Sequence, residues 1–354
     1  MTALRTSTLL RLEDSERLLA ELLAHFAEHA TVIRTEAGAR LLTDYGTVDI
    51  ARRAEGLSVE VSSGSAGTLA MIKVFIAEHV FEFAEAAAMV WSGDGADERR
   101  LPHFQKLHVL TASSITPRMR RITFRCENAA PFVGETHYQA RLLIPPRGRP
   151  PVWPSLAANG RILWATGEEA LTSRVYTIRS VDPDRNILTM DMVLHGQSGS
   201  PGSRFALEAR TGDVVGVLGP GGGGRPDARS LLLLGDETAL PTIARMLESL
   251  PSTASAEVVI EVADDREEQA LVSNARLRIH WLHRQGIEPG RSDLLEHSLL
   301  DYVLQDKAAL ADDTGRFVWA GCEHALADRL RTVLRDHAAL TRDRHRIIGY
   351  WARK

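Results

Sequence analysis

Hydrophobic and polar residues follow three successive patterns along the 354-residue chain, and each pattern predicts a different kind of domain. In residues 1–97, the segment 15–29 has the spacing of a helix, and short strands are predicted at Arg40–Thr43 and Leu57–Val61. A second helical stripe follows, made of Leu69, Ile72, Ile76, His79, Val80 and Phe83. We therefore expect a small α+β domain, followed by a polar, glycine-bearing linker at 91–100.

Residues 104–222 contain short runs that are typical of β-strands and are separated by turn residues. The runs are MRRITFR, ARLLI, RVYTIRS, ILTMDMVL and DVVGVL. In ILTMDMVL, large apolar residues alternate with Thr189 and Asp191, which is the period-two pattern of a half-buried strand. The segment IPPRGRPPVWP is predicted to be a loop, because its prolines cannot serve a central strand. Several short strands close together indicate an antiparallel β-barrel.

The pattern changes again in residues 228–354, where strands alternate with helices. SLLLLG is a fully apolar run that suits a buried parallel strand, and ETALPTIARMLESL follows it as a helix. Further strands are predicted at EVVIEVAD, LRIHWL, RFVWAG and HRIIGYW, with a helix between the last two. This alternation predicts an α/β domain with a mostly parallel sheet. The chain is expected to be multidomain, with domains at 1–97, 104–222 and 228–354.

Composition narrows the functional class without identifying it. A net charge of −4 and a pI of about 6.4 argue against a general nucleic-acid surface, which needs a strong basic excess. The sequence has no apolar run of about 18 residues and no secretory leader, so we expect neither a membrane span nor export. The two cysteines, Cys126 and Cys322, lack a zinc-site spacing. We expect reduced thiols, a cytoplasmic location, and a monomer or a weak dimer.

The stretch SRVYTIRS, residues 173–180, is the first to suggest a ligand. In a strand, Arg174 and Tyr176 share one face, so a cation and an aromatic ring would lie side by side. A flavin would use both, because its diphosphate needs cations and its flat ring system packs on a tyrosine. Thr177 would add a hydrogen bond to the ring or the ribityl chain. An ordinary barrel strand with outward arginines has the same spacing, so the stretch alone does not decide.

Three other segments have the form of ligand-binding turns. HGQSGSPGSRFA, residues 195–206, leaves a strand for a helix that Ser203 would cap, and free N–H groups at a helix start favour a phosphate. LLLLGDETALP ends a buried strand at Gly235 and begins a helix near Thr238. FVWAGCEHAL repeats that arrangement around Gly321. In open α/β sheets, ligands bind at this carboxyl edge of the strands.

Several motifs in this order resemble the siderophore-interacting protein family, whose members are NAD(P)H-dependent ferric-siderophore reductases related to ferredoxin reductases. The motifs are TPRMRRITF at 116–124, R-x-Y-T-x-R at 174–179, VLHG at 193–196, GDVVGVLGPGG at 212–222, GDETALP at 235–241, EVAD at 261–264 and GYW at 349–351. The resemblance covers roughly 104–354. Residues 15–92, with GARLLTDYG and FIAEHVFEFA, resemble more weakly a small uncharacterised domain that often accompanies this family.

The resemblance implies FAD as the bound cofactor, with NADPH or NADH as the electron donor, and it assigns residues to each. The flavin would be held by Arg174, Tyr176 and Thr177. Its diphosphate or adenine side would be surrounded by His195, Gly196, Gly202 and Ser203. The nicotinamide cleft would be lined by Gly235, Asp236, Glu237, Thr238, Ala320 and Gly321. No catalytic side chain and no metal ligand is expected, because the flavin performs the chemistry and the iron arrives chelated.

The end of the chain departs from the family pattern. Cys322 separates Gly321 from Glu323 where the family usually reads A-G-E, which leaves the roles of Cys322 and Glu323 open. The tail GYWARK replaces the usual glycine-ended tail, and we expect Trp351, Arg353 and Lys354 at the rim of the substrate site. The arginine-rich C-terminal region would be a solvated face or, near a flavin edge, would attract an anionic iron chelate.

The expected function is reduction of ferric siderophores by NAD(P)H through FAD, with release of ferrous iron inside the cell. One alternative is a broader NAD(P)H:flavin or quinone reductase on the same scaffold. Another is a siderophore-binding protein without catalysis. The sequence leaves the siderophore, the choice between NADPH and NADH, and the role of the N-terminal domain open.

Two further motifs invite a functional interpretation that we reject. GPGGGG at 219–224 satisfies G-x-G-x-x-G, but it precedes a strand where the dinucleotide motif requires a helix, so we interpret it as a hinge. His25 and His29 lie one helical turn apart and would suit a metal, yet the sequence shows no third ligand. We interpret them as a structural or surface pair.

Overall fold

The computed structural model describes residues 3–11, 14–26, 30–43, 45–84, 88–194, 200–305, 316–338 and 340–353. The chain forms two compact units. The first comprises Met1–Phe104 and Pro145–Leu171, and the second comprises Gln105–Ile144 and Thr172–Lys354. The polypeptide thus leaves the second unit after residue 144 and returns to it at residue 172. Of the predicted domains at 1–97, 104–222 and 228–354, the second includes residues 145–171 in its range.

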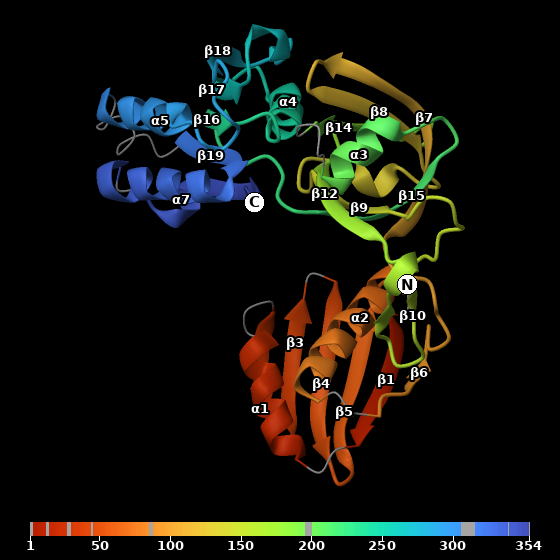
Figure 1. The fold of residues 1–354 in the computed structure, drawn as a ribbon. Coiled ribbons are helices and arrows are strands. Elements are labelled where there is room, and N and C mark those ends of the chain that lie inside the picture. Colours follow the sequence, from red (N-terminus) through yellow and green to blue (C-terminus); the bar gives the residue numbers. More distant parts are fainter. Residues whose placement is uncertain are drawn as a thin grey trace. The chain divides into compact units, whose positions relative to one another are not determined.

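The first unit contains a six-stranded antiparallel sheet in the order β2–β3–β4–β5–β1–β6. Its strands are β1 (Leu4–Arg11), β2 (Thr31–Thr35), β3 (Gly38–Thr43), β4 (Gly46–Arg53), β5 (Gly56–Ser63) and β6 (Trp91–Gly93). Helices α1 (Ser15–Phe26) and α2 (Ala66–Phe83) cover one face of this sheet (Figure 1). Both predicted helices and both predicted strands are confirmed, and residues 27–29 of the first helix lie outside the described residues.

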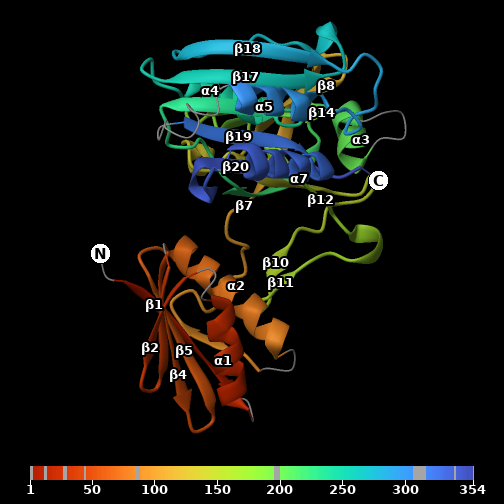
Figure 2. The same cartoon turned by 90° about the vertical axis from the view of Figure 1, so that its left-hand side faces the viewer.

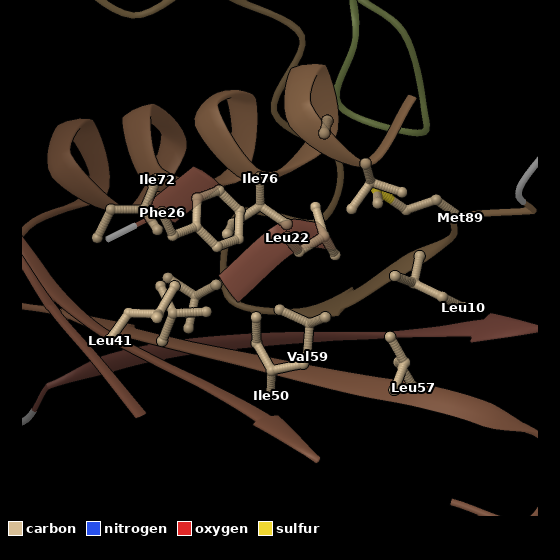
Figure 3. Packing of buried hydrophobic residues seen from close by; sticks show 14 of the residues in the cluster. Leu10, Leu22, Phe26, Leu41, Ile50, Leu57, Val59, Ile72, Ile76 and Met89 are labelled. Carbon is tan, nitrogen blue, oxygen red and sulfur yellow. The ribbon is translucent and has the colours of Figure 1, made fainter. Parts of the chain in front are cut away.

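The hydrophobic core of the first unit lies between the sheet and its two helices (Figure 3). Phe26 from α1 and Ile76 from α2 point toward Leu41 and Ile50 on the strands. These side chains are at most 2% exposed, and burying one of them contributes roughly 1.5–3 kcal/mol. The spacing of the apolar residues therefore determines which face of each helix packs on the sheet.

The stretch 91–100, which we predicted to be a linker, begins as part of the sheet. Its first three residues form β6 and pair with β1, so the prediction is wrong for that part. The backbone N–H of Asp94 then donates to the carbonyl oxygen of Arg5 at 2.7 Å, which extends the attachment by one residue. The short length of β6 explains why no alternating pattern revealed it.

The excursion between residues 145 and 171 packs on the first unit. It carries a two-stranded ribbon of β10 (Ser155–Leu156) and β11 (Ile162–Leu163). The indole N–H of Trp91 donates to the carbonyl oxygen of Asn159 at 3.1 Å, and the first N–H of β11 donates to Glu78 of α2 at 3.0 Å. The proline-rich segment at its start is a loop, as predicted.

The second unit begins with a seven-stranded sheet in the order β12–β9–β15–β7–β8–β14–β13. Its strands are β7 (Phe104–Thr116), β8 (Met119–Arg125), β9 (Gln139–Ile144), β12 (Thr172–Thr177), β13 (Ser180–Asp182), β14 (Ile187–Val193) and β15 (Val214–Gly221). The segment after β12 connects the two ends of this order. The N–H of Ile178 donates to the carbonyl oxygen of Tyr138 at 2.7 Å, and that of Arg179 donates to Thr189 at 2.7 Å. The antiparallel sheet therefore curls into the predicted barrel-like form.

Strand β14 is buried on both faces, which corrects the half-buried strand predicted from ILTMDMVL. Its inward residues Leu188, Met190 and Met192 are fully buried as expected. Asp191 on the other face is only 4% exposed, because Arg121 donates two hydrogen bonds of 2.7 Å to its carboxylate. A fully paired carboxylate can occupy a buried position that the polar pattern assigned to solvent.

The remainder of the second unit is a five-stranded parallel sheet in the order β18–β17–β16–β19–β20. Its strands are β16 (Ser230–Gly235), β17 (Ser255–Val262), β18 (Arg276–His283), β19 (Arg316–Glu323) and β20 (His345–Trp351). Helix α4 (Leu240–Glu248) covers one face, and α5 (Leu294–Gln305) and α7 (His324–Val333) cover the other (Figure 2). This confirms the predicted α/β domain.

The glycine-rich segment 219–224 connects the two sheets of the second unit. It leads from β15 into β16, a strand, which confirms that it is not a dinucleotide-binding turn. A Cβ atom on Gly224 would lie 1.7 Å from the carbonyl oxygen of Glu135, and the side chain of Glu135 is also paired with Arg225 at 2.5 Å. Glycine is therefore required for close backbone approach, and the hinge role stays a prediction.

Within the described part of the chain, no helix is long and apolar enough to cross a membrane. Cys126 and Cys322 are both buried and unbonded to each other, which agrees with the predicted reduced thiols.

Candidate functional site

The end of strand β12 brings together the residues that the sequence placed at a flavin. The side chains of Arg174 and Tyr176 lie on one face, and both approach Gly202. A Cβ atom on Gly202 would lie 2.0 Å from the Tyr176 hydroxyl oxygen and 3.8 Å from the Arg174 side chain. Burial raises the pKa of Tyr176 to about 12, although Arg174 opposes this, so the hydroxyl is a neutral hydrogen-bonding group. Arg174 is exposed, which leaves its charge accessible to an anion.

Helix α3 (Pro201–Glu208) begins at this face, but its cap is not the residue we predicted. Ser200 is the N-cap, and its hydroxyl accepts the N–H of Ser203 at 3.3 Å. The hydroxyl of Ser203 instead donates to the carbonyl oxygen of Val193 at 3.2 Å and is buried. Proline is favoured at the first helical position, so the helix begins at Pro201 and Ser200 becomes its N-cap. His195 and Gly196 lie outside the described residues.

Thr177, the last residue of β12, connects the barrel to the parallel sheet. Its hydroxyl lies 2.7 Å from that of Thr242 on α4, which in turn lies 3.1 Å from the Tyr350 hydroxyl on β20. Burial raises the pKa of Tyr350 to about 12, so this hydroxyl also remains protonated. Three hydroxyl groups in a row thus lie between the predicted flavin strand and the predicted nicotinamide edge.

The predicted nicotinamide edge is formed by the ends of β16 and β19, where Gly235 and Gly321 are parallel neighbours. A Cβ atom on Gly235 would lie 2.5 Å from the Ala239 methyl carbon, and one on Gly321 would lie 3.0 Å from it. The glycines therefore permit the turn before α4 to pack against the strand ends. Ala320 is fully buried in the core on the other face of the sheet. The roles of these residues toward a dinucleotide stay predictions.

Asp236 is a buried carboxyl group at this edge, and its surroundings shift its pKa. Its Oδ1 accepts the N–H of Thr238 at 2.9 Å, and its Oδ2 accepts the indole N–H of Trp351 at 2.8 Å. Burial, together with the charge of Glu237, raises the pKa of Asp236 to about 6, and the hydrogen bonds partly oppose this. Two predicted residues from segments more than 100 positions apart, Asp236 and Trp351, are thereby brought into contact.

Glu237, which the resemblance places at the nicotinamide cleft, is a member of a buried ionic network. Arg284, 2% exposed, donates to both oxygens of the Glu237 carboxylate and to Glu261 at 3.3 Å. Such a buried network holds its members by mutual charge, since leaving one member unpaired is strongly unfavourable. The Glu237 carboxylate is thus bound within the domain, and its predicted place at the cleft remains untested. Sequence reasoning missed Arg284 because nothing local marks it as buried.

The two residues whose roles were open, Cys322 and Glu323, are structural. The Cys322 thiol is fully buried, and burial raises its pKa, so it is inert. Glu323 caps α7, because its Oε2 accepts the N–H groups of Ala325 at 2.7 Å and Leu326 at 3.1 Å. Its Oε1 accepts the N–H of Arg353 at 3.2 Å, which ties the chain end to the sheet edge. The predicted rim residue Lys354 lies outside the described residues.

Helix α4 makes two arginine-mediated contacts with the barrel that sequence reasoning missed, one ion pair and one set of hydrogen bonds to backbone carbonyl groups. Arg179, the second arginine of SRVYTIRS, donates to both oxygens of Glu248 at 2.9 and 2.5 Å. Arg245 donates to the carbonyl oxygens of Ile178 at 2.7 Å and Phe132 at 2.8 Å. The two arginines of the stretch therefore differ, because Arg174 is exposed and Arg179 is paired with Glu248.

A cavity of about 180 Å³ lies where β17 and β18 end. It is lined by Arg118, Ala263, Asp264, Gly286, Ile287, Glu288 and Pro289. This is the carboxyl edge of the parallel sheet, where such folds bind nucleotides. The nearby Arg266 donates to both carboxylate oxygens of Asp264 at 2.7 and 3.0 Å. The one arginine of the acidic segment EVADDREE is therefore paired within that segment. The choice between NADPH and NADH stays open.

The residues of the barrel fit an FAD. The exposed cation of Arg174, the phenol of Tyr176 and the start of α3 meet at one place, where a diphosphate and a ring edge would find a charge, a hydroxyl and a helix dipole. Thr177 adds a hydroxyl on the side of the parallel sheet. No described residue brings a carboxylate into hydrogen-bonding contact with Arg174. The donor set is therefore suited to an anionic, planar cofactor.

Comparison with known protein families agrees with this geometry. Residues 228–354 match the siderophore-interacting protein family, and residues 108–224 match the siderophore-interacting FAD-binding domain. Residues 7–92 match a family described as an uncharacterised protein conserved in bacteria. The three matched ranges follow the three patterns of the sequence, and the predicted resemblance is confirmed.

Individual relatives point the same way. The ferric vibriobactin reductase ViuB of Vibrio cholerae is 31% identical over 198 residues, which is 54% of this chain and 68% of that protein. The crystal structure of a siderophore utilization protein from T. fusca has a TM-score of 0.57 and 31% identity, covering 72% of this chain and 95% of that one. A ferredoxin reductase of carbazole 1,9a-dioxygenase, at 12% identity and a TM-score of 0.50 over 74% of each chain, shares the fold.

We predict that Trp351→Phe raises the pKa of Asp236 above its value of about 6, because the lost indole N–H stabilises the ionised carboxylate. Folding raises the pKa of Asp236 from 3.8 to about 6, so the free energy of unfolding falls as the pH rises from about 4 to about 6. In the variant this fall continues to a higher pH. The measurement is a carbon-13 NMR titration of the Asp236 carboxyl group. Trp164→Phe, which changes an exposed indole in the first unit, is the control, and equal midpoints in both variants would contradict the prediction.

Proposed function

Because the chain belongs to the siderophore-interacting protein family, we propose that it is an FAD-dependent reductase that uses NAD(P)H to reduce ferric iron held in a siderophore. The observation that carries the proposal is the contact between β12 and the parallel sheet. Thr177 of the matched FAD-binding region lies 2.7 Å from Thr242 of the matched C-terminal region. A flavin at Arg174 and Tyr176 would therefore lie beside the sheet edge at which a nicotinamide is expected.

The chemistry needs a cofactor that takes two electrons at once and gives them up singly, and FAD supplies this when bound. One hydride removed from NAD(P)H carries two electrons, enough to reduce two ferric ions. The protein orients the partners and shields the site. Ferric iron is a hard cation held by oxygen donors, and its reduction weakens that hold, so the siderophore releases it.

The residues of the barrel act as a docking frame. Arg174 neutralises diphosphate charge, and Tyr176 holds a ring edge while its hydroxyl packs on α3. Because the pKa of Tyr176 is raised to about 12, the phenol stays neutral beside an anionic ligand and adds no repulsion. Thr177 fixes the strand end against α4 and so sets the distance between the two binding regions.

Residues at the edge of the parallel sheet hold the C-terminal segment in place and take no part in the chemical step. Asp236 holds the Trp351 indole, and Glu323 holds the backbone of Arg353, so the C-terminal segment lies along the nicotinamide edge. Arg353 also donates to the carbonyl oxygen of Gly290 at 3.2 Å. We place Trp351 and Arg353 at the rim where a ferric chelate would approach. No side chain need exchange a proton in an electron transfer of this kind.

The cellular setting follows from the substrates. NAD(P)H is a cytosolic reductant, so we place the reaction in the cytoplasm, after a ferric siderophore has been imported. The ferric siderophore is the expected partner. We keep the expectation of a monomer or a weak dimer as a prediction.

The proposed function is tested by comparing turnover on ferric chelates and on quinones with NADPH or NADH as donor. We expect ferric siderophores to give the higher kcat/KM, with ferrous iron trapped by a colorimetric chelator as the readout. Faster quinone turnover would instead favour the broader flavin or quinone reductase. Tight ferric-chelate binding without oxidation of NAD(P)H would favour a binding protein.

We predict that Arg174→Ala loses most of its bound FAD, because the diphosphate then lacks its cation at the β12 edge. The measurement is the ratio of flavin absorbance to protein absorbance in the purified variant, with added FAD titrated to obtain the Kd. Arg185→Ala, at an exposed turn next to β14, is the matched control and should keep the wild-type ratio. Full flavin retention in Arg174→Ala would count against the assignment of this residue.

A further inference from the structure

Two histidines and a glutamate meet on the helices of the first unit, which contains none of the residues assigned to the flavin or to the nicotinamide. His25 lies in the last turn of α1, and His79 and Glu82 lie in the last two turns of α2. One ligand atom of each of the three side chains lies within 4.8 Å of the other two. The two imidazoles are partly buried, and Glu82 is exposed.

The arrangement depends on the packing of α1 beside α2 over the sheet (Figure 1). His79 and Glu82 are three residues apart, so helical geometry puts them on one face. His25 approaches from the neighbouring helix, and its ring centroid lies 4.7 Å from that of His79. A sequence that separates these residues by more than 50 positions gives no hint of the contact. Our sequence interpretation paired His25 with His29, which lies outside the described residues.

The tautomer of His79 is set by its backbone partner. Its Nδ1 lies 2.6 Å from the carbonyl oxygen of Phe75. A carbonyl oxygen only accepts hydrogen bonds, so Nδ1 carries the proton and Nε2 presents its lone pair whenever the ring is neutral. Metal-ligating histidines commonly donate their second N–H to a backbone carbonyl in this way, which fixes the ring and raises its basicity.

Phenylalanine rings hold both imidazoles in place. Phe75 and Phe26 lie 4.3 and 5.4 Å from the His79 ring, and Phe83 lies 5.9 Å from the His25 ring, measured between centroids. Such walls restrict rotation of the ligands, while the exposed Glu82 leaves one side of the cluster open to solvent. A site with fixed nitrogen ligands and one mobile carboxylate has both preorganisation and an entry path.

We propose that His25, His79 and Glu82 bind a divalent first-row transition metal ion. Two imidazole nitrogens and one carboxylate oxygen, with open positions for water, form a ligand set used by zinc and by ferrous iron. With bonds of about 2.0–2.2 Å, ligand atoms of one ion are roughly 3–3.5 Å apart, so ligand atoms that lie as far apart as 4.8 Å must approach by roughly 1.3–1.8 Å. The exposed Glu82 side chain can supply that movement. The ferrous ion released in the proposed reaction has this chemistry, although the site does not rest on that reaction.

The test is metal binding by the full chain after removal of metal with a chelator. Isothermal titration calorimetry with Zn²⁺ gives the stoichiometry and the Kd, and visible absorption of Co²⁺ reports the ligand geometry. We expect one ion per chain at this site, and we expect Zn²⁺ to displace Co²⁺. Anaerobic competition between Fe²⁺ and Co²⁺ shows whether ferrous iron also binds.

Variants decide whether the ion binds at the cluster. We expect Glu82→Gln, which changes an exposed side chain, to weaken binding at least about tenfold, and His79→Ala to weaken it further. His297→Gln and Glu60→Gln change exposed residues elsewhere and should leave the Kd unchanged. Circular dichroism checks the fold, and if His79→Ala does not fold, Glu82→Gln still decides.

Two results would overturn the proposal: no binding by the wild-type chain, or a Kd that is the same in Glu82→Gln and wild type. Both measurements report metal binding and use neither NAD(P)H nor a ferric siderophore. Their failure would therefore leave the proposed reductase function untouched, and a failed reductase assay would leave the metal site untouched.

Discussion

The contact of helix α4 with the barrel is the constraint on which the proposed electron path depends. Arg245 donates to the carbonyl oxygen of Ile178, which directly follows β12, and to that of Phe132, and its guanidinium group lies 4.4 Å from the centre of the Tyr138 ring. Burial lowers the pKa of Arg245, yet a guanidinium remains charged in proteins, so its hydrogen bonds are charge-assisted. Removing it would leave buried carbonyls unsatisfied, at a cost of about 1–3 kcal/mol for each group. The barrel and the parallel sheet are thus fixed through a specific polar contact.

This contact explains how the end of β12 can lie against α3 on one side and α4 on the other. Arg174 and Tyr176, before position 177, approach Gly202 of α3. Ile178 and Arg179, after it, are held by hydrogen bonds to Arg245 and Glu248 of α4. Thr177 stands at the division and contacts Thr242. A planar cofactor bound on one side would therefore lie at a defined separation from a nucleotide bound on the other. Orientation of this kind is the main contribution that a protein makes to a flavin reaction.

Periodicity in the sequence predicted most of the fold because it records which face of an element is buried. The strands MRRITFR and SLLLLG have the predicted bounds exactly as β8 and β16. The ordered motifs likewise identified the family. The structure also brings Arg174, Tyr176 and Gly202 close together, while their role toward a flavin stays a prediction. These successes concern local patterns, or patterns of residues that a known family shares.

Charged residues were predicted poorly because their partners are distant in sequence and no pattern encodes the pairing. Arg179 with Glu248 and Arg284 with Glu237 are examples, and each pair changed the interpretation of a residue in a motif. Glu323 had an open role until the structure showed that it caps α7. The His25 cluster is a similar case, since α1 and α2 had to pack before its ligands met.

The most direct test of the central claim is the visible spectrum of the purified protein during an anaerobic titration. We predict flavin absorption bands that bleach when NADPH or NADH is added. We predict that the bands return when a ferric siderophore is then added, with ferrous iron appearing in step. A protein that carries no flavin, or whose bound flavin is not reduced by either nucleotide, would contradict the account.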